Sequence, residues 1–155
     1  VMKGEKIPEA DWHDTMILAS IVESEAGSDA DRKKVARVFL NRLDDPTAET
    51  VGLLQSDATV SYGIGKRAIA PTPEQKADAG NPFNTHVHKG LPPTPISNPG
   101  KSSIDAAAHP AKGPWFYFVT VDPDTGETKF AVTYAEHQKN TEEFLAWCVA
   151  NKEKC

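Results

Sequence analysis

The prolines of this chain divide it into segments of different character. Ten of the 12 prolines lie between Pro46 and Pro114, whereas the segments on either side carry regular apolar patterns. Proline fixes φ and lacks a backbone donor, so it interrupts helices and central strands. The middle of the chain is therefore expected to hold short elements and irregular loops. Residues 91–100, the richest in proline, are predicted to form a rigid loop that lines a cleft, because proline lowers the entropy lost on ordering.

Two helices are predicted before this region. The first runs over residues 9–25, and Gly27 is expected to end it in a left-handed conformation. Ser28 and the acidic residues just after it favour the start of a second helix, which carries an apolar face and ends before Pro46. Because the connection is short, the two helices should lie side by side.

A short helix and a hairpin are predicted after the proline-rich region. Residues 102–108 should form a helix with Ser102 or Ser103 at its N-cap. Residues 115–121 are mostly aromatic or β-branched, which favours a strand. The turn sequence Asp-Pro-Asp-Thr-Gly separates this strand from residues 128–132, which are predicted to return as its antiparallel partner.

The chain is predicted to close with a helix that carries one of its two cysteines. This helix runs over residues 141–152 and is expected to bury Phe144, Leu145 and Cys148. On a continuous helix Cys148 and Cys155 would be about 10 Å apart, too far for a disulfide. A bridge requires the last turn to unwind, and the sequence leaves both arrangements open.

Composition agrees with one globular domain of the α+β class. At 155 residues, with 39% hydrophobic and 25% charged residues, the chain can bury a core. We expect a single, mainly helical domain over residues 1–155, with a small β-hairpin sheet and long loops rich in proline and glycine. A net charge of −5 without a basic run argues against nucleic acid and anionic membrane surfaces as partners. The chain has no run of 18 apolar residues and starts at Val1, so we expect a fragment of a longer protein, and the missing run does not show that the parent protein lacks an anchor.

A carboxylate interrupts an apolar stripe on the first helix. At helical spacing Glu25 lines up with Leu18, Ile21 and Val22, which should enter the core. A carboxyl group held against apolar surface loses solvation of its charged form, which raises its pKa toward the range of a general acid. The alternative is a solvated glutamate in a frayed last turn, and the pattern alone leaves both interpretations open.

Other patterns give weaker signals for chemistry. His86 and His88 form a His-x-His pair without a third ligand nearby, which is weak evidence for zinc. His109 is expected to cap the end of a helix, and His137 is expected at the surface. The chain lacks Gly-x-Ser-x-Gly and the Walker spacing, which excludes the usual serine nucleophile and phosphate loop. We expect neither a metal nor a cofactor.

The remaining candidates are neutral polar and aromatic side chains. Such groups suit the hydroxyl and N-acetyl groups of sugars, and they suit a polar core equally well. They are Gln55, Ser56, Thr59, Tyr62, Phe83, Asn84, Thr85 and Tyr117.

Several motifs recur in an order that is typical of one family. The first is ILASIVESE at residues 17–25, which is followed by RKKVARVFLNRL at residues 32–43. Further motifs are LQSDATVSYG, NPFNT, GLPPTPISNPG, AAAHPAK, YFV and TYAEH, which span residues 54–137. Together they resemble the MltG (YceG-like) family of endolytic murein transglycosylases over about residues 15–140. So many motifs in order are more specific than any one of them.

The resemblance implies a lysozyme-like catalytic domain that cuts peptidoglycan glycan strands between MurNAc and GlcNAc and leaves 1,6-anhydro-MurNAc ends. It places the catalytic acid at Glu25, the second acid of the Glu-x-Glu motif. Glu23 is the first acid and lies about 200° away around the helix. Protonated Glu25 would donate to the glycosidic oxygen and then accept the proton of the MurNAc C6 hydroxyl, so no second carboxylate is required. The expected substrate contacts are Glu23, Gln55, Thr59, Tyr62, Asn84, Thr85 and Tyr117.

The chain departs from the family pattern at two positions. Ala26 stands where members often have Thr, so it supplies no hydroxyl beside the acid, and Ala58 stands where Pro is common. The resemblance also implies a location at the extracytoplasmic face of the bacterial membrane, a single-pass anchor upstream, and cell-wall synthases as partners. Two alternatives stay open, a hydrolase of lysozyme or cortex-lytic type and a glycan-binding module without catalysis.

Overall fold

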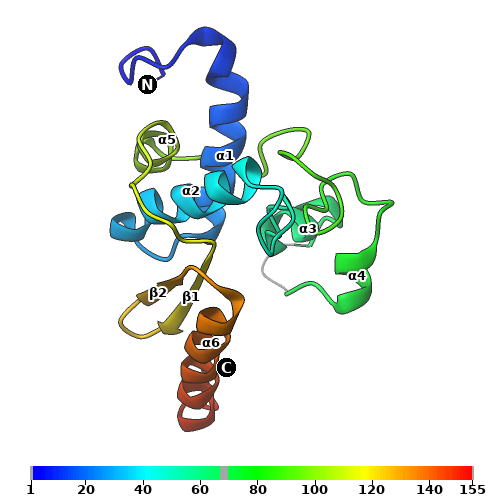
Figure 1. Ribbon diagram of the computed structural model, residues 1–155, viewed down its shortest axis with the longest axis vertical. Helices are drawn as coiled ribbons and strands as arrows, with labels where there is room; N and C mark the ends of the chain where they lie inside the picture. The colour runs from blue at the N-terminus through cyan, green and yellow to red at the C-terminus, as the bar shows by residue number, and fades with distance from the viewer. Residues whose placement is uncertain (1, 67–69, 155) are drawn as a thin grey trace.

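The computed structural model describes residues 2–66 and 70–154. These residues form six α-helices, a short 3-10 helix and a hairpin of two strands (Figure 1). The order is η1 (Glu9–Asp11), α1 (Trp12–Glu25), α2 (Asp29–Asp44), α3 (Asp57–Gly63), α4 (Pro73–Ala77), α5 (Lys101–Ala108), β1 (Tyr117–Asp122), β2 (Glu127–Ala131) and α6 (Tyr134–Ala150). The architecture is the mainly helical α+β class expected from the sequence.

Helix α1 is the centre of the hydrophobic core. Its residues from Ile17 to Val22 are all buried, so the helix is enclosed on every side along this stretch. Helices α2 and α5 both pack against it, and α2 contributes Val35 and Phe39 to the same core. The last turn of α1 leaves this enclosed stretch and brings Glu25 to the edge of the core.

The predicted boundaries of α1 and α5 need correction. Gly27 does not adopt a left-handed conformation; α1 ends because Ala26 turns to an extended backbone with ψ of 122°. Helix α5 has Gly100 as its N-cap, so the serines at 102 and 103 lie inside the helix. The hydroxyl of Ser103 donates to Glu23 at 2.7 Å, and it therefore does not cap its own helix.

The proline-rich loop is hydrogen-bonded to α1, which holds it in place. The Ile96 N–H donates to Ser20 Oγ at 2.9 Å, and Ser97 Oγ donates to the Ser20 carbonyl at 2.9 Å. The loop lies with α3 and α4 on one side of α1 (Figure 1). The hairpin and α6 lie apart from these loops, so the C-terminal turn of α1 faces two different parts of the chain.

The hairpin pairs in antiparallel register, with Tyr117 opposite Ala131. Helix α6 begins at Tyr134 rather than near residue 141, because Thr133 and Glu136 form a capping box. This Thr-x-x-Glu pattern can be recognised in the sequence. The helix therefore starts next to the hairpin and not several residues later.

Helix α6 packs against β1 and projects from the rest of the molecule (Figure 1). None of its residues is buried, and Leu145 is 56% exposed, so the predicted burial of Leu145 is wrong. Phe144 and Cys148 are half-buried. Cys148 is disulfide-bonded, whereas Cys155 lies outside the described residues. Among the described helices, none combines the length and the apolar character that a membrane crossing needs.

Candidate active site

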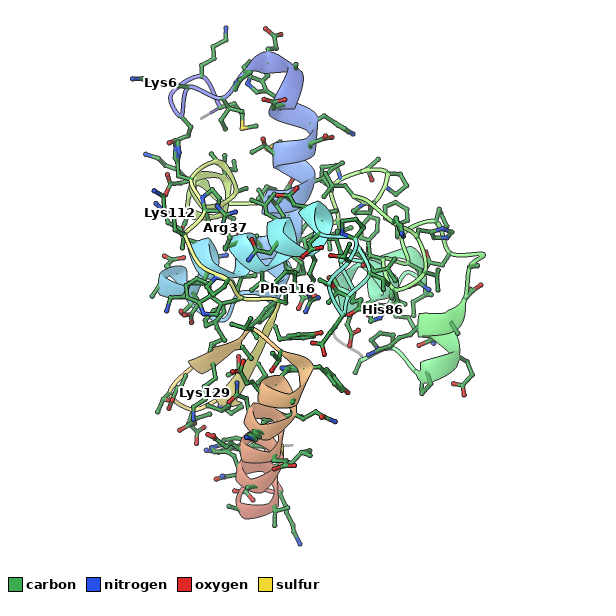
Figure 2. All side chains as sticks on the ribbon, in the orientation of Figure 1. Lys6, Arg37, His86, Lys112, Phe116 and Lys129 are labelled. Atoms are coloured by element: carbon green, nitrogen blue, oxygen red, sulfur yellow. The ribbon has the colours of Figure 1, made fainter. Side chains whose placement is uncertain are left out.

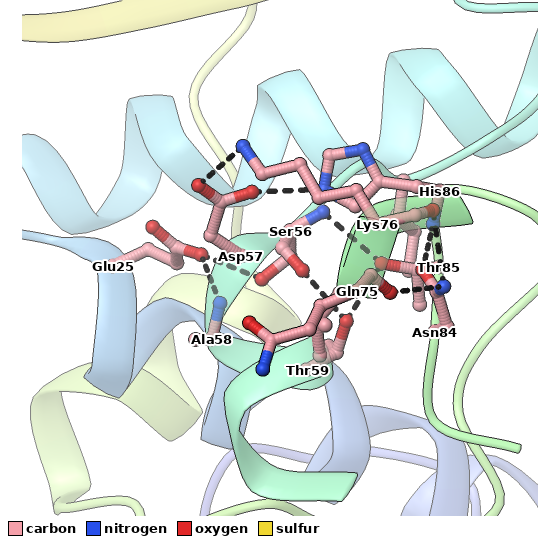
Figure 3. Close-up of polar contacts among 12 residues, drawn as sticks. Glu25, Ser56, Asp57, Ala58, Thr59, Gln75, Lys76, Asn84, Thr85 and His86 are labelled. Atoms are coloured by element: carbon pink, nitrogen blue, oxygen red, sulfur yellow. Dashed lines mark hydrogen bonds and ion pairs between the residues drawn. The ribbon is translucent and has the colours of Figure 1, made fainter. Parts of the chain in front are cut away.

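Glu25, the last residue of α1, meets the N-terminus of α3. Its Oε1 accepts a hydrogen bond from Ser56 Oγ at 2.5 Å and one from the Ala58 N–H at 3.3 Å (Figure 3). Its Oε2 makes no hydrogen bond with any residue that the structure describes. One oxygen of the carboxyl group is therefore fixed, and the other is available to a ligand.

Two cavities meet at this carboxyl group. The first has a volume of about 510 Å³ and is lined by Ser24, Ser61, Tyr62, Ile96 and Ser97 among others. The second, of about 540 Å³, is lined by residues that include Arg42, Gln55, His86, Tyr117, Tyr134 and His137. Glu25 and Asp57 line both. A ligand long enough to occupy both cavities therefore contacts Glu25.

Ser56 is held in place by a buried network of hydroxyl groups. Its N–H donates to Thr85 Oγ1 at 3.0 Å, and its carbonyl accepts from Thr59 Oγ1 at 2.7 Å. The two threonine hydroxyls lie 2.8 Å apart. Thr59 and Thr85, predicted as substrate contacts, are 0% and 2% exposed, line neither cavity and support Ser56.

Asn84, also predicted as a substrate contact, lines neither cavity. It is fully buried, and its Nδ2 donates to the backbone carbonyls of Gln75, Lys76 and Asp78 at the end of α4. Its Oδ1 accepts from the His86 N–H at 3.0 Å. The side chain thus uses its amide to fix α4 and the loop that carries His86.

Glu23 points away from both cavities, toward α5. Its Oε2 accepts from Ser103 Oγ at 2.7 Å and from the Gly100 N–H at 3.0 Å, and it lies 3.4 Å from Arg32 Nη1. The hydrogen bond from Ser103, followed by that from Gly100, lowers the pKa of Glu23 below its usual 4.5. Glu23, predicted as a substrate contact, therefore ties α1 to α5 and lines neither cavity.

Three predicted residues do line the cavities. Tyr62, 39% exposed, borders the first cavity, and its ring contacts that of Phe83 edge-on with the ring centroids 4.9 Å apart. Gln55 borders the second and has a φ of 54°, an uncommon left-handed conformation for a residue with a side chain. Tyr117 also borders the second cavity, and its hydroxyl donates to Glu49 at 3.3 Å. Burial, followed by the charge of Glu49, raises the pKa of Tyr117.

Arg42 is a buried cation in the wall of the second cavity that the sequence analysis did not identify. Its Nε donates to the Phe116 carbonyl at 2.7 Å, and its Nη1 donates to the Leu54 carbonyl. Burial lowers its pKa to about 10, against the opposing effect of the nearby negative groups, so it remains charged at neutral pH. The sequence pattern could have predicted the burial of Arg42, because this residue follows Val35 and Phe39 at helical spacing on the buried face of α2.

Asp57 is a second carboxylate beside Glu25. Its Oδ1 lies 2.8 Å from His86 Nε2, and its Oδ2 accepts from Lys76 Nζ at 2.8 Å (Figure 3). Burial raises the pKa of Asp57, but the hydrogen bonds from His86 and Lys76 together outweigh it and leave the pKa below its usual 3.8. Asp57 is therefore a fixed anion at neutral pH. The two residues of the His-x-His pair have different partners, since His88 Nε2 lies 3.0 Å from the Ala79 carbonyl oxygen.

Comparison with known proteins identifies the family of this chain. The model of the YceG-like family matches residues 2–143. The chain belongs to the YceG-like family. Within that family, an endolytic murein transglycosylase of Bacillus subtilis (strain 168) is 38% identical over 134 residues, which cover 86% of this chain and 35% of the relative. An endolytic murein transglycosylase of Streptococcus pneumoniae serotype 2 (strain D39 / NCTC 7466) is 28% identical over 135 residues, 86% of this chain and 24% of the relative.

A solved structure of the family supports the fold. The 2.6 Å crystal structure of a YceG-like protein from Listeria monocytogenes superposes with a TM-score of 0.74 at 36% identity, covering 89% of this chain and 42% of that one. The match confirms the α+β fold class. This YceG-like chain spans about a third of the length of the Bacillus subtilis relative and less of the Streptococcus pneumoniae one.

One group of potential metal ligands lies away from the cavities of this YceG-like chain. Side-chain atoms of Glu5, Asp105 and His109 come within 4.8 Å of one another. Lys33 Nζ already pairs with Asp105 at 2.8 Å, and His109 Nε2 lies 3.5 Å from Glu5. Ion pairs therefore account for the group. His109 is the C-cap of α5, as predicted.

Proposed function

We propose that this YceG-like chain is the catalytic domain of an endolytic murein transglycosylase. It would cleave peptidoglycan glycan strands between MurNAc and GlcNAc and leave 1,6-anhydro-MurNAc ends. The observation that carries this proposal is the position of Glu25, whose Oε1 is fixed by two donors where two cavities meet. The names of the curated relatives support the same activity.

The hydrogen bonds of Glu25 select which oxygen carries the catalytic proton. Oε1 accepts from Ser56 and from the Ala58 N–H, so in the protonated acid it is the carbonyl oxygen and the proton resides on Oε2. In the first step this proton passes to the glycosidic oxygen as its bond to MurNAc C1 breaks. The leaving sugar departs as an alcohol, and positive charge develops at C1.

The second step returns the proton to the same carboxylate. Oε2 of Glu25 accepts the proton of the MurNAc C6 hydroxyl, and the C6 oxygen forms a bond to C1 of the same sugar. The substrate's N-acetyl group can relieve the charge at C1 between the two steps. No water is consumed, and Glu25 ends the cycle protonated.

Asp57 supports this mechanism as a fixed charge. Both of its oxygens are occupied, by His86 and by Lys76, which makes it a poor base for activating water. A preorganised anion beside the cleft stabilises positive charge that develops in the transition state. Its occupied oxygens favour transglycosylation over a two-carboxylate hydrolysis.

The disulfide-bonded state of Cys148 supports an extracytoplasmic location, since disulfides persist in oxidising compartments. We place this domain at the outer face of the bacterial membrane, anchored by a segment outside the chain. There it would meet glycan strands as cell-wall synthases produce them.

Product analysis tests the proposal. Purified glycan strands are digested with the wild-type chain and with Glu25→Gln, and the products are resolved by mass spectrometry. Anhydro-MurNAc ends in the wild-type digest and intact strands with Glu25→Gln are expected. Reducing ends would show a hydrolase, and binding without cleavage by the wild-type chain would show a binding module.

A further inference from the structure

The second cavity has two walls of opposite character. One wall consists of the rings of Tyr117, Tyr134 and His137, from β1 and the start of α6; we call it the aromatic wall. The other wall carries the polar side chains of Asp57, Lys76 and His86. In Figure 2 the labelled His86 lies in the loop region of α3 and α4, across from the hairpin and α6. Segments far apart in sequence thus enclose one cavity.

The aromatic wall is held rigidly. The rings of Tyr117 and His137 stack with centroids 5.2 Å apart and planes inclined by 18°, and the Tyr134 ring lies 5.9 Å from Tyr117. Glu49 Oε2 accepts from both the Tyr117 hydroxyl, at 3.3 Å, and the Tyr134 N–H, at 2.8 Å. The wall therefore needs little ordering when a ligand arrives.

Tyr134 is the exposed member of this wall. It is 51% exposed, whereas Tyr117 is 6% exposed and His137 is half-buried. His137 was expected at the surface; instead it packs inside the wall, where burial, followed by the charge of Arg42, lowers its pKa and keeps the ring neutral at pH 7. An aromatic face that is fixed, uncharged and open to a cavity is a surface that an apolar ligand face can cover.

The polar wall suits a neutral ligand rich in hydroxyl groups. Asp57 and Lys76 form an ion pair, so the wall presents one group of each sign and no excess of either. They still offer a carboxylate acceptor and an ammonium donor at fixed positions. A pyranose ring has this dual character, with C–H groups on its face and hydroxyl groups around its edge. A flat apolar ligand would leave the charged wall without partners.

We propose that the second cavity is a saccharide subsite in which a sugar ring of the glycan strand stacks on Tyr134. The sugar's hydroxyl edge faces Asp57, Lys76 and His86. The inference rests on the proposed function, because Glu25 is shared by both cavities and the strand must pass it. The subsite belongs to the second cavity, whereas Tyr62 borders the first. It therefore binds only a strand that is long enough to extend from Glu25 into the second cavity.

The test removes the Tyr134 ring and measures binding and cleavage separately. Glycan strands of defined length are titrated against Glu25→Gln and against Glu25→Gln with Tyr134→Ala, and KM and kcat are measured in the Glu25 background. Loss of an exposed stacking ring should raise Kd and KM for long strands about tenfold, while the change in kcat stays smaller. Tyr134→Phe should restore most of the affinity, because stacking uses the ring face.

Leu145→Ala is the matched control. Leu145 is an exposed apolar residue of the same helix that lines neither cavity, so its removal should leave Kd and KM unchanged. Equal affinity of the Glu25→Gln chains with and without Tyr134→Ala would overturn the subsite, as would equal losses in Tyr134→Ala and Leu145→Ala. These outcomes are separate from failure of the proposed function, which would appear as reducing ends or uncleaved strands in the wild-type digest.

Discussion

The last turns of α1 carry two glutamates, Glu23 and Glu25, which lie on different faces of the helix and have different roles. On the α5 face, Glu23 Oε2 is bound by Ser103, the Gly100 N–H and Arg32, and Glu23 lines neither cavity. On the α3 face, Glu25 has one oxygen held by Ser56 and the Ala58 N–H. A carboxylate that ties two helices together away from the cavities stabilises the fold, whereas one that lines a cavity can exchange a proton with a ligand. Rotation around one helix separates the two roles.

The largest effect is expected from Glu25→Gln. An amide has no acidic proton, so kcat for release of fragments from labelled glycan strands should fall by about 10³-fold or more. The Gln side-chain oxygen can still accept from Ser56, and the thermal midpoint should stay within a few degrees. Turnover above a tenth of the wild-type rate would remove Glu25 from the catalytic role.

Asp57→Asn should have the next largest effect. It removes the fixed anion, and we expect kcat to fall about 10²-fold. Because the pKa of Asp57 is below its usual 3.8, the wild-type rate should lose this contribution only below about pH 4. Asp44→Asn, at the exposed end of α2, is the matched control and should keep the wild-type rate. Full activity of Asp57→Asn would contradict the electrostatic role.

Ser56→Ala tests how firmly Glu25 must be held. The variant loses the 2.5 Å hydrogen bond and leaves Oε1 with the Ala58 N–H alone. We expect kcat to fall about tenfold while KM changes little, since the hydroxyl orients the acid. Steady-state kinetics on glycan strands measures both values. A rise in KM with unchanged kcat would instead make Ser56 a substrate contact.

Glu23→Gln should change stability and leave activity within twofold. Weakening a partly exposed set of hydrogen bonds should lower the free energy of unfolding by about 1 kcal/mol at pH 7. The pKa of Glu23 is depressed in the folded state, so its stabilisation is present above the ordinary value of 4.5 and is lost as pH falls through the lowered folded value. Urea unfolding of both chains at pH 7 and pH 3 should show the difference shrinking in acid. A loss of activity without a loss of stability would reverse the two roles.

Regular patterns made the helices and the catalytic candidate predictable. Glu25 stands four residues after Ile21 and seven after Leu18, so it shares the direction of the stripe that enters the core. The same logic applied to α2 reveals Arg42 after Val35 and Phe39. A charged residue that completes an apolar face marks a place where the core meets a cavity.

Residue type alone did not separate ligand contacts from buried polar structure. Thr59, Asn84 and Thr85 are neutral hydrogen-bonding groups, as Gln55 is, yet only Gln55 lines a cavity. The polar wall was not predictable for another reason. Asp57 bonds with Lys76 and His86, which lie 19 and 29 residues away in the sequence, so no local sequence pattern predicts these contacts.

Digestion of glycan strands in water enriched in oxygen-18 tests most directly that Glu25 serves as acid and then as base toward one sugar. If the C6 hydroxyl is the nucleophile, the products carry anhydro ends without label, and Glu25→Gln forms none. Incorporation of one labelled oxygen at each new end would show that water attacks C1 and would contradict the account.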